Sequence, residues 1–155
     1  MNQSVHAVVQ HRFAAPAERV YDAWLDPEWI GCWMFASGLR EERIVRLAVE
    51  PRVGGKFSFV VDRQGEIIDH IGEYLEVDRP GLLVFTWATR GASPDPSRVV
   101  VEIVPCAGGC ELTVTHVLAA RWDGLADQVA ETWRALLAAL AGALAESTHL
   151  TLNQS

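Results

Sequence analysis

Two histidines in this sequence lie on segments in which apolar and polar side chains alternate. By this alternation His11 shares a face with Val9 and Phe13, and His116 shares a face with Val114. A buried histidine tends toward its neutral form and can act as an acid or a base near pH 7. The alternative is a structural histidine, hydrogen-bonded at the rim of a cavity, because buried polar groups are usually satisfied in this way.

The segment 67–77 carries further titratable side chains, which can be arranged in two ways. One phase of a strand places His70 and Tyr74 on the same face, and the other phase places Asp69 and Glu73 together. Alternation alone does not choose between these phases, and a bulge at Gly72 would change the phase midway. Which pair faces inward stays open at this point.

Recognisable catalytic and metal-binding motifs are absent from the sequence. It contains no G-x-S-x-G, no H-E-x-x-H, no G-x-x-x-x-G-K and no cluster with metal-ligand spacing. The acidic residues have simpler explanations, since Asp26 is expected to cap a helix and Glu41-Glu42 to lie in a solvated loop. We therefore name no catalytic residue, no metal site and no cofactor. This absence weighs against an enzyme without excluding one.

The three cysteines are an odd number, which suits a reducing compartment better than a disulfide framework. Cys106 and Cys110 flank residues 107–109, which look like the tip of a hairpin, so these two thiols could face each other. A zinc site would need a second ligand pair, and the sequence offers none at conventional spacing. We expect all three thiols, including Cys32, to be buried or idle.

Length and composition limit the classes of protein that this chain can represent. It has 155 residues, 50% of them hydrophobic and 21% charged, which predicts a single domain over residues 1–155. The formal net charge of -7 argues against a nucleic-acid partner, because such affinity depends on Lys and Arg that neutralise phosphates. The sequence shows no signal peptide, and its longest apolar run, 135–145, is far shorter than the about 20 residues of a membrane span. A cytoplasmic protein is expected.

A strand and two short helices are predicted near the N-terminus. Alternation over 5–13 predicts the strand, and Pro16 suits the first turn of the helix that follows. The apolar face of that helix would consist of Val20, Ala23 and Trp24. A second helix start follows at once, because Asp26 can cap and Pro27 can occupy the first helical position.

From residue 43 onward the pattern predicts about six strands. The side chains expected to share their faces are Val45, Leu47 and Val49; Phe57, Phe59 and Val61; Leu83, Phe85 and Trp87; Val99, Val101 and Ile103; and Leu112, Val114 and His116. Turn residues separate these segments, and connections this short exclude helical crossovers. The strands must therefore form mainly an antiparallel meander, in which Gly54-Gly55 is a tight link.

The last element is predicted to be a long helix over about 123–147, with residues 148–155 as a frayed tail. Asp123 can cap its start. Its larger apolar side chains recur at helical spacing: Leu125, Val129, Trp133, Leu136, Leu137, Leu140 and Leu144. Such a helix needs a long apolar surface, and the face of the sheet is the only large one available.

This order of elements and several segments resemble the Aha-type family (activator of HSP-90 ATPase homologue, C-terminal-domain-like) of the SRPBCC superfamily, which includes START and Bet v proteins. The matching segments are 12–24, 26–33, 51–57 (P-R-V-G-G-K-F), 72–87, 109–116 and the helix around Trp133. The resemblance implies an α+β helix-grip (START-like) fold, in which a curved antiparallel sheet of about six to seven strands wraps around a long C-terminal helix, with two short helices after the first strand. One departure is visible: relatives often carry Gly-Trp where this chain has Thr132-Trp133, which would narrow the space beside the helix.

The resemblance also implies binding of an apolar small molecule, lipid-like or polyketide-like, between the sheet and the helix. The aromatic content agrees with such a cavity, because ligand sites are commonly lined by apolar and aromatic side chains. The residues expected to bind the ligand are Trp33, Phe57, Phe59, His70, Tyr74, Phe85, Trp87, His116, Trp133 and Leu137. The alternative for each of the aromatic side chains is that it simply fills the core.

Other roles are compatible with the same family. A polyketide cyclase or aromatase type of enzyme would use His70 or His116 with Tyr74, and this requires an inward titratable pair within hydrogen-bond reach. Stimulation of the HSP-90 ATPase is less expected, because the eukaryotic activators engage the chaperone through a separate N-terminal domain that this chain has no residues to build. A homodimer is a further option, since alanines 126, 130, 138, 141 and 145 extend the apolar surface of the helix.

Overall fold

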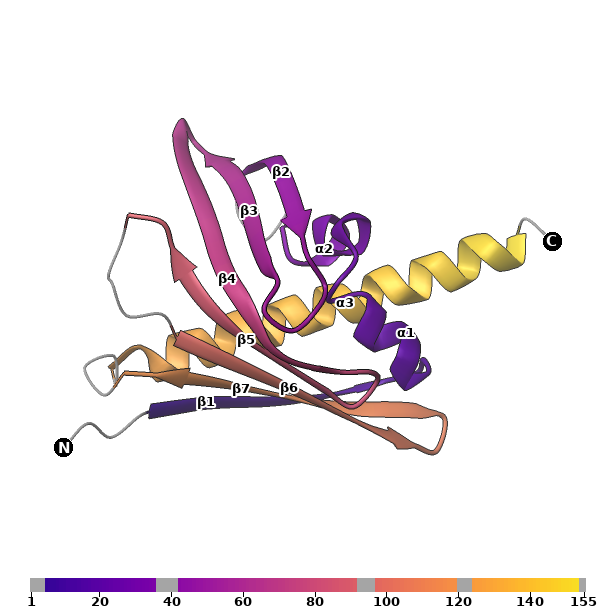
Figure 1. Cartoon of the computed structure of the whole chain (residues 1–155). Coiled ribbons are helices and arrows are strands. Elements are labelled where there is room, and N and C mark those ends of the chain that lie inside the picture. The colour runs from indigo at the N-terminus through magenta and orange to yellow at the C-terminus, as the bar shows by residue number, and fades with distance from the viewer. Residues whose placement is uncertain (1–4, 36–41, 92–96, 120–123, 154–155) are drawn as a thin grey trace.

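A computed structural model describes residues 5–35, 42–91, 97–119 and 124–153 (Figure 1). In chain order the elements are β1 (Val5–Phe13), α1 (Ala17–Asp22), α2 (Pro27–Trp33), β2 (Arg43–Val49), β3 (Lys56–Arg63), β4 (Glu66–Asp78), β5 (Leu82–Thr89), β6 (Ser97–Cys106), β7 (Gly109–Leu118) and α3 (Ala126–Asn153). The predicted order of elements is confirmed: a strand, two short helices, a run of strands and a long helix.

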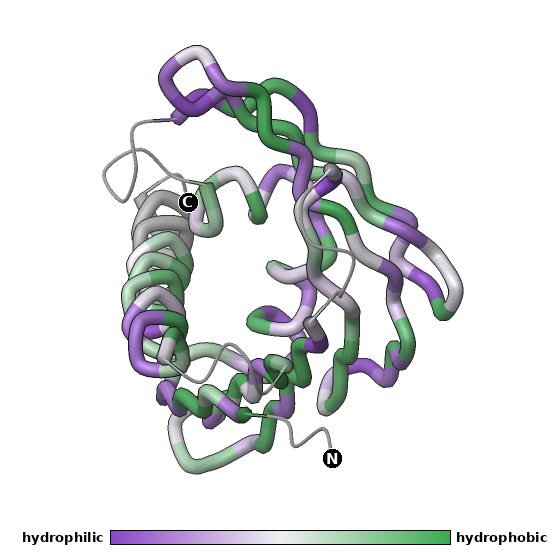
Figure 2. The backbone as a smooth tube through the Cα atoms, turned by 90° about the vertical axis from the view of Figure 1, so that its left-hand side faces the viewer, coloured by the Kyte–Doolittle hydropathy of each residue, from purple (hydrophilic) through white to green (hydrophobic). Residues whose placement is uncertain are grey.

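The strands form one 7-stranded antiparallel sheet in the order β1-β7-β6-β5-β4-β3-β2. Strands β2 to β7 therefore pair with their neighbours in sequence, as their short connections require. Strand β1 joins at the far end, beside β7. Figure 2 shows the sheet curving around one side of the α3 coil, so the predicted α+β helix-grip arrangement is confirmed.

The predicted inward faces of β3, β6 and β7 are confirmed. Their buried side chains are Phe57, Phe59 and Val61; Val99, Val101 and Ile103; and Leu112, Val114 and His116. In β2 the prediction is wrong for Val45, which is 51% exposed. A register shift between Ile44 and Arg46 makes Val45 the extra residue of a bulge, so it no longer shares the face of Leu47.

Strand β4 turns His70 and Tyr74 inward, and both are buried. Pairing of β4 with β3 continues without a break across Gly72, so no bulge changes the phase there. The register shift of β4 lies further on, between Tyr74 and Glu76, opposite β5. The sheet therefore selects the histidine and tyrosine phase that alternation left open.

Helix α2 begins as predicted, whereas Pro16, expected in the first turn of α1, is its N-cap residue. Asp26 caps α2, because its Oδ1 accepts a hydrogen bond of 3.0 Å from the backbone N–H of Glu28. Pro27 is the first residue of α2. The residues predicted to form the apolar face of the first helix are buried: Val20, Ala23 and Trp24. Helix α1 ends at Asp22, so Ala23 and Trp24 directly follow it.

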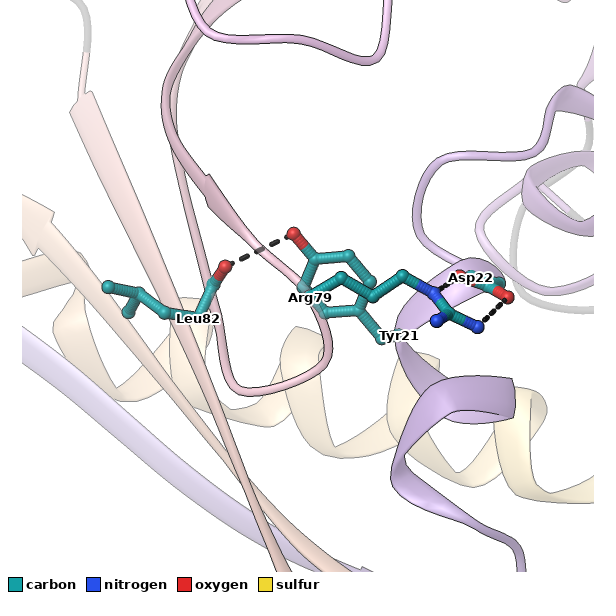
Figure 3. A network of polar contacts seen from close by, with 4 residues as sticks. All are labelled: Tyr21, Asp22, Arg79 and Leu82. Atoms are coloured by element: carbon teal, nitrogen blue, oxygen red, sulfur yellow. Dashed lines mark hydrogen bonds and ion pairs between the residues drawn. The ribbon is translucent and has the colours of Figure 1, made fainter.

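Polar contacts connect α1 to the turn between β4 and β5 (Figure 3). The Tyr21 hydroxyl donates to the Leu82 carbonyl oxygen at 3.1 Å, and the Arg79 guanidinium bonds both carboxylate oxygens of Asp22, at 2.8 and 3.0 Å. Burial, with a further effect of the nearby Asp78 carboxylate, raises the pKa of Tyr21 to about 12. Tyr21 therefore stays a hydrogen-bond donor at neutral pH and holds α1 against the sheet.

Gly54-Gly55 forms the predicted tight link between β2 and β3. Gly54 adopts a φ of 82°, which favours glycine. A Cβ on Gly55 would collide with the Glu50 carbonyl oxygen. Both glycines are therefore required by the geometry of the turn.

Helix α3 begins at Ala126 and ends at Asn153, beyond the predicted end at 147, so most of the segment predicted as a frayed tail is helical. The predicted cap, Asp123, lies outside the described residues. Leu125 precedes the helix and is exposed, whereas the buried side chains of the stripe are Trp133, Leu137, Leu140 and Leu144. No helix in the described part of the chain is long and apolar enough to cross a membrane.

Two expectations about individual side chains are wrong. Cys106 pairs with Gly109 across the hairpin and is exposed, whereas Cys110 is buried, so the two thiols lie on opposite faces of the sheet. Glu42 is not solvated, because its side chain is 3% exposed and its Oε2 accepts hydrogen bonds of 3.0 and 2.8 Å from Arg63. Its neighbour Glu41 lies outside the described residues.

Gly72 is expected to be intolerant of any side chain. A Cβ there would clash with the Phe57 ring and the Thr86 carbonyl oxygen. We expect Gly72→Ala to lower the free energy of unfolding by roughly 1–3 kcal/mol through overpacking. The control is Gly142→Ala, because Gly142 lies in α3 with open space around its Cβ position, and it should raise that free energy by roughly 0.5–1 kcal/mol. Urea unfolding measures both, and a Gly72→Ala protein as stable as the wild type would contradict the packing.

Candidate ligand-binding site

A cavity of about 200 Å³ lies between the sheet and α3. Strands β4, β5 and β7, the end of the α2 segment and one face of α3 contribute its wall. The lining residues are Met34, Phe35, His70, Trp87, His116, Val129, Thr132, Trp133 and Leu136. A mainly apolar and aromatic wall with few polar groups is usual for small-molecule sites.

Helix α3 forms one wall of the cavity. Val129, Thr132, Trp133 and Leu136 follow one another at spacings of three and one, so they lie on one face of the helix. The Thr132 hydroxyl donates a hydrogen bond of 3.0 Å to the carbonyl oxygen of Gln128, one turn earlier. This bond uses its only proton, so toward any other group the hydroxyl oxygen can only accept.

Stacked rings stiffen the wall. His70 is stacked against Phe35 and Trp87, with ring centroids 5.5 and 5.1 Å apart. Trp133 is stacked on Trp24, with the centroids 5.7 Å apart. Because each ring is held by another ring, the cavity has flat and preformed aromatic surfaces.

His116 is the centre of a hydrogen-bond chain beside the cavity. The Trp133 Nε1 donates to His116 Nδ1 at 3.0 Å. The His116 Nε2 lies 2.6 Å from Ser97 Oγ, and the Ser97 hydroxyl donates to the Trp87 carbonyl oxygen at 3.1 Å. An indole N–H can only donate, so Nδ1 must be the acceptor and Nε2 must carry the proton.

This tautomer prevents His116 from acting as a base toward Ser97. In a catalytic Ser-His pair the histidine accepts the hydroxyl proton through an unprotonated nitrogen. Here Nε2 donates to Ser97, and Nδ1 is occupied by Trp133. Burial also lowers the pKa of His116 to about 4, so the ring is neutral at pH 7. In the structure both ring nitrogens of His116 are therefore used in hydrogen bonds within the protein.

Four of the ten residues predicted to bind a ligand line the cavity: His70, Trp87, His116 and Trp133. The other six are buried outside its wall: Trp33, Phe57, Phe59, Tyr74, Phe85 and Leu137. All six belong to one buried hydrophobic cluster, in which the ring centroid of Phe57 lies 4.6 Å from that of Phe59 and 5.5 Å from that of Tyr74. Their position corresponds to the core-filling alternative, while ligand contact stays a prediction for all ten.

The sequence prediction omitted five lining residues: Met34, Phe35, Val129, Thr132 and Leu136. Val129 and Leu136 belong to the apolar stripe of the helix, and Thr132 marks the departure from the Gly-Trp pattern. A stripe does not show which of its members face empty space. Met34 and Phe35 follow α2 directly and carry no periodic signal.

A larger groove of about 710 Å³ lies around Gly72, on the face of the sheet turned away from α3. Its lining includes Ser58 and Arg90, whose polar groups already pair with Asp69 at 2.6 and 2.9 Å. Burial would raise the pKa of Asp69, but the hydrogen bonds from Ser58 and Arg90 outweigh it and hold that pKa below its usual value. This groove is more open, and charged side chains such as Glu50, Lys56 and Glu73 are part of its lining, so the inner cavity is the better candidate for an apolar ligand.

The buried neutral state of His116 predicts a loss of stability in acid. The pKa is about 4 in the folded protein and about 6.5 in an unfolded chain, so the unfolded state binds more protons between these values. This contribution is present in full above about pH 6.5 and is lost as the pH falls toward 4. It amounts to roughly 3 kcal/mol, at about 1.4 kcal/mol per pKa unit.

Urea unfolding of the wild type and of His116→Gln at about pH 7, 5.5 and 4.5 measures this contribution. Glutamine does not titrate, so the stability advantage of the wild type should shrink by roughly 2–3 kcal/mol between the first and last pH. An advantage that is constant across this range would show that His116 titrates normally.

The fold is shared with solved structures of low sequence identity. A protein of Nitrosomonas europaea is 22% identical with a TM-score of 0.78, and the alignment covers 92% of this chain and 96% of that chain. A protein of unknown function from Staphylococcus aureus is 15% identical with a TM-score of 0.82, and the alignment covers 96% of this chain and 98% of that chain. An AHSA1-like protein from Aeromonas hydrophila is 20% identical with a TM-score of 0.74, and the alignment covers 96% of this chain and 94% of that chain.

These likenesses show the fold alone, and a search of the curated proteins finds no match. The family itself is shown by a family model. The model described as "Activator of Hsp90 ATPase homolog 1-like protein" matches residues 14–145, which is most of the chain. This confirms the resemblance inferred from the sequence segments. The chain therefore belongs to the family of Activator of Hsp90 ATPase homolog 1-like proteins.

Proposed function

We propose that this protein binds an apolar small molecule in the cavity between the sheet and α3. The observation that carries the proposal is a cavity of about 200 Å³ whose wall is mainly aromatic and aliphatic. Stacking of His70 on Trp87 and the hydrogen bond between Trp133 and His116 hold this wall in place before any ligand arrives. A preformed site loses little conformational entropy on binding, which favours affinity.

Two of the three residues named for catalysis of the cyclase type, His116 and Tyr74, give it no support. Such a reaction needs a group that gains and loses a proton near neutral pH at the ligand. Both nitrogens of His116 are engaged, and its pKa is lowered by burial. Burial raises the pKa of Tyr74, which is outside the cavity wall, so its phenol stays protonated. None of these features of the cavity supports stimulation of the Hsp90 ATPase, so this role is not proposed.

Native mass spectrometry of the protein isolated from its own host tests the proposal directly. We expect a second population of the protein, heavier than the apoprotein by the mass of one small molecule. Partition of this molecule into an organic solvent after denaturation would show that it is apolar. Recovery of the apoprotein alone, under conditions that preserve other non-covalent complexes, would contradict the proposal.

Filling the cavity should remove the bound molecule. Leu136 lines the cavity and is partly buried, so Leu136→Trp is expected to occupy the ligand space and to weaken binding at least about tenfold, or ~1.4 kcal/mol. Ala135→Trp is the matched control, because it adds the same indole to an exposed position of the same helix. Occupancy in native mass spectra measures both variants. Unchanged occupancy in Leu136→Trp would place the ligand elsewhere.

A further inference from the structure

The volume of the cavity restricts the size of a ligand, which the apolar character of the wall does not. A dry apolar cavity of about 150 Å³ is large enough for benzene, and drug-sized ligands occupy pockets of about 300–1,000 Å³. The cavity here measures about 200 Å³. It therefore has space for a molecule of one or two rings, whereas a long acyl chain or a multi-ring polyketide would have to extend out of it.

The shape of the wall favours a flat ligand. Trp87 and Trp133 are large planar side chains of the lining, and His70 adds a third ring. Stacking of His70 on Trp87 at 5.1 Å and of Trp133 on Trp24 at 5.7 Å keeps these planes from turning. Aromatic molecules gain from offset-stacked or edge-to-face contacts with such rings, which an aliphatic ligand of equal size does not make.

Three polar side chains of the wall, those of Trp133, His116 and Thr132, have hydrogen bonds that define what they can still offer a ligand. The Trp133 N–H is used by His116, whose other nitrogen is used by Ser97. The Thr132 hydroxyl gives its proton to Gln128, so its oxygen offers lone pairs and no proton. A ligand hydroxyl or N–H therefore finds an acceptor at Thr132, whereas a ligand carbonyl finds no donor there.

We propose that the cavity binds an aromatic molecule of one or two rings that carries a hydroxyl or N–H group, and that this group donates a hydrogen bond to Thr132 Oγ1. This inference rests on the proposed function and narrows it to a ligand class. Thr132 lines the cavity on α3 and supplies the acceptor.

Two probes of nearly the same shape test the hydrogen bond: 2-naphthol, which carries a hydroxyl, and 2-methylnaphthalene, which carries a methyl group instead. Isothermal titration of the wild type with each gives the ratio of their dissociation constants. In Thr132→Val, which keeps the branched shape and removes the oxygen, the preference for 2-naphthol should fall by roughly 3- to 10-fold, the effect of one neutral hydrogen bond. Thr132→Ser keeps the oxygen and should retain the wild-type ratio.

A ratio that changes by less than about twofold in Thr132→Val would overturn the hydrogen bond to Thr132. Palmitate serves as the third probe. If palmitate binds to the wild type and neither naphthalene derivative does, the compact aromatic ligand is refuted while the proposed binding function stands. If the naphthalene derivatives bind equally well to Leu136→Trp, the cavity is not their site and the inference is overturned, while the occupancy of Leu136→Trp in native mass spectra separately decides the proposed function.

Discussion

The hydrogen bond between Trp133 and His116 fixes the helix to the sheet at the point where the cavity lies. Apolar surfaces alone allow a helix to slide or rotate on a sheet, because hydrophobic contact has no direction. The 3.0 Å bond from the indole N–H to the imidazole does have a direction, and it joins α3 to β7. Ser97 extends the chain to the Trp87 carbonyl oxygen, so β5 and β6 are joined as well. The side-chain donors and acceptors of Trp133, His116 and Ser97 in this hydrogen-bond series all have partners, which offsets the usual cost of burying polar groups.

The cavity is the space that the packed aromatic side chains leave unfilled beside Trp133 and His116. Phe57, Phe59, Tyr74 and Phe85 pack ring on ring, and Gly72 lets the Phe57 ring approach the backbone of the sheet. Their mutual contacts fill one part of the space between sheet and helix. Further along the helix, the stacked rings of His70 and Trp87 line a remaining volume instead of filling it.

The hydrogen bonds of His116 to Trp133 and Ser97 also affect the chemistry that is available beside the cavity. A histidine that is held by two hydrogen bonds and desolvated by burial is a good structural element and a poor proton carrier at neutral pH. The Thr132 hydroxyl, which donates its proton to Gln128, can recognise a hydrogen-bond donor without taking its proton.

The sequence by itself determined the features that depend on neighbours along the chain. Alternation placed Phe57, Val101 and Leu112 inside, Asp26 was identified as a cap, and the order of short segments indicated the family and the helix-grip fold. Only the tertiary structure decided that β4 turns His70 inward, that a bulge exposes Val45, and that Phe57 fills the core while Trp87 lines a cavity. The physical reason is that periodicity reports the side on which a residue lies. Whether that side is filled, empty or hydrogen-bonded depends on residues that are distant in sequence, as Ser97, His116 and Trp133 are.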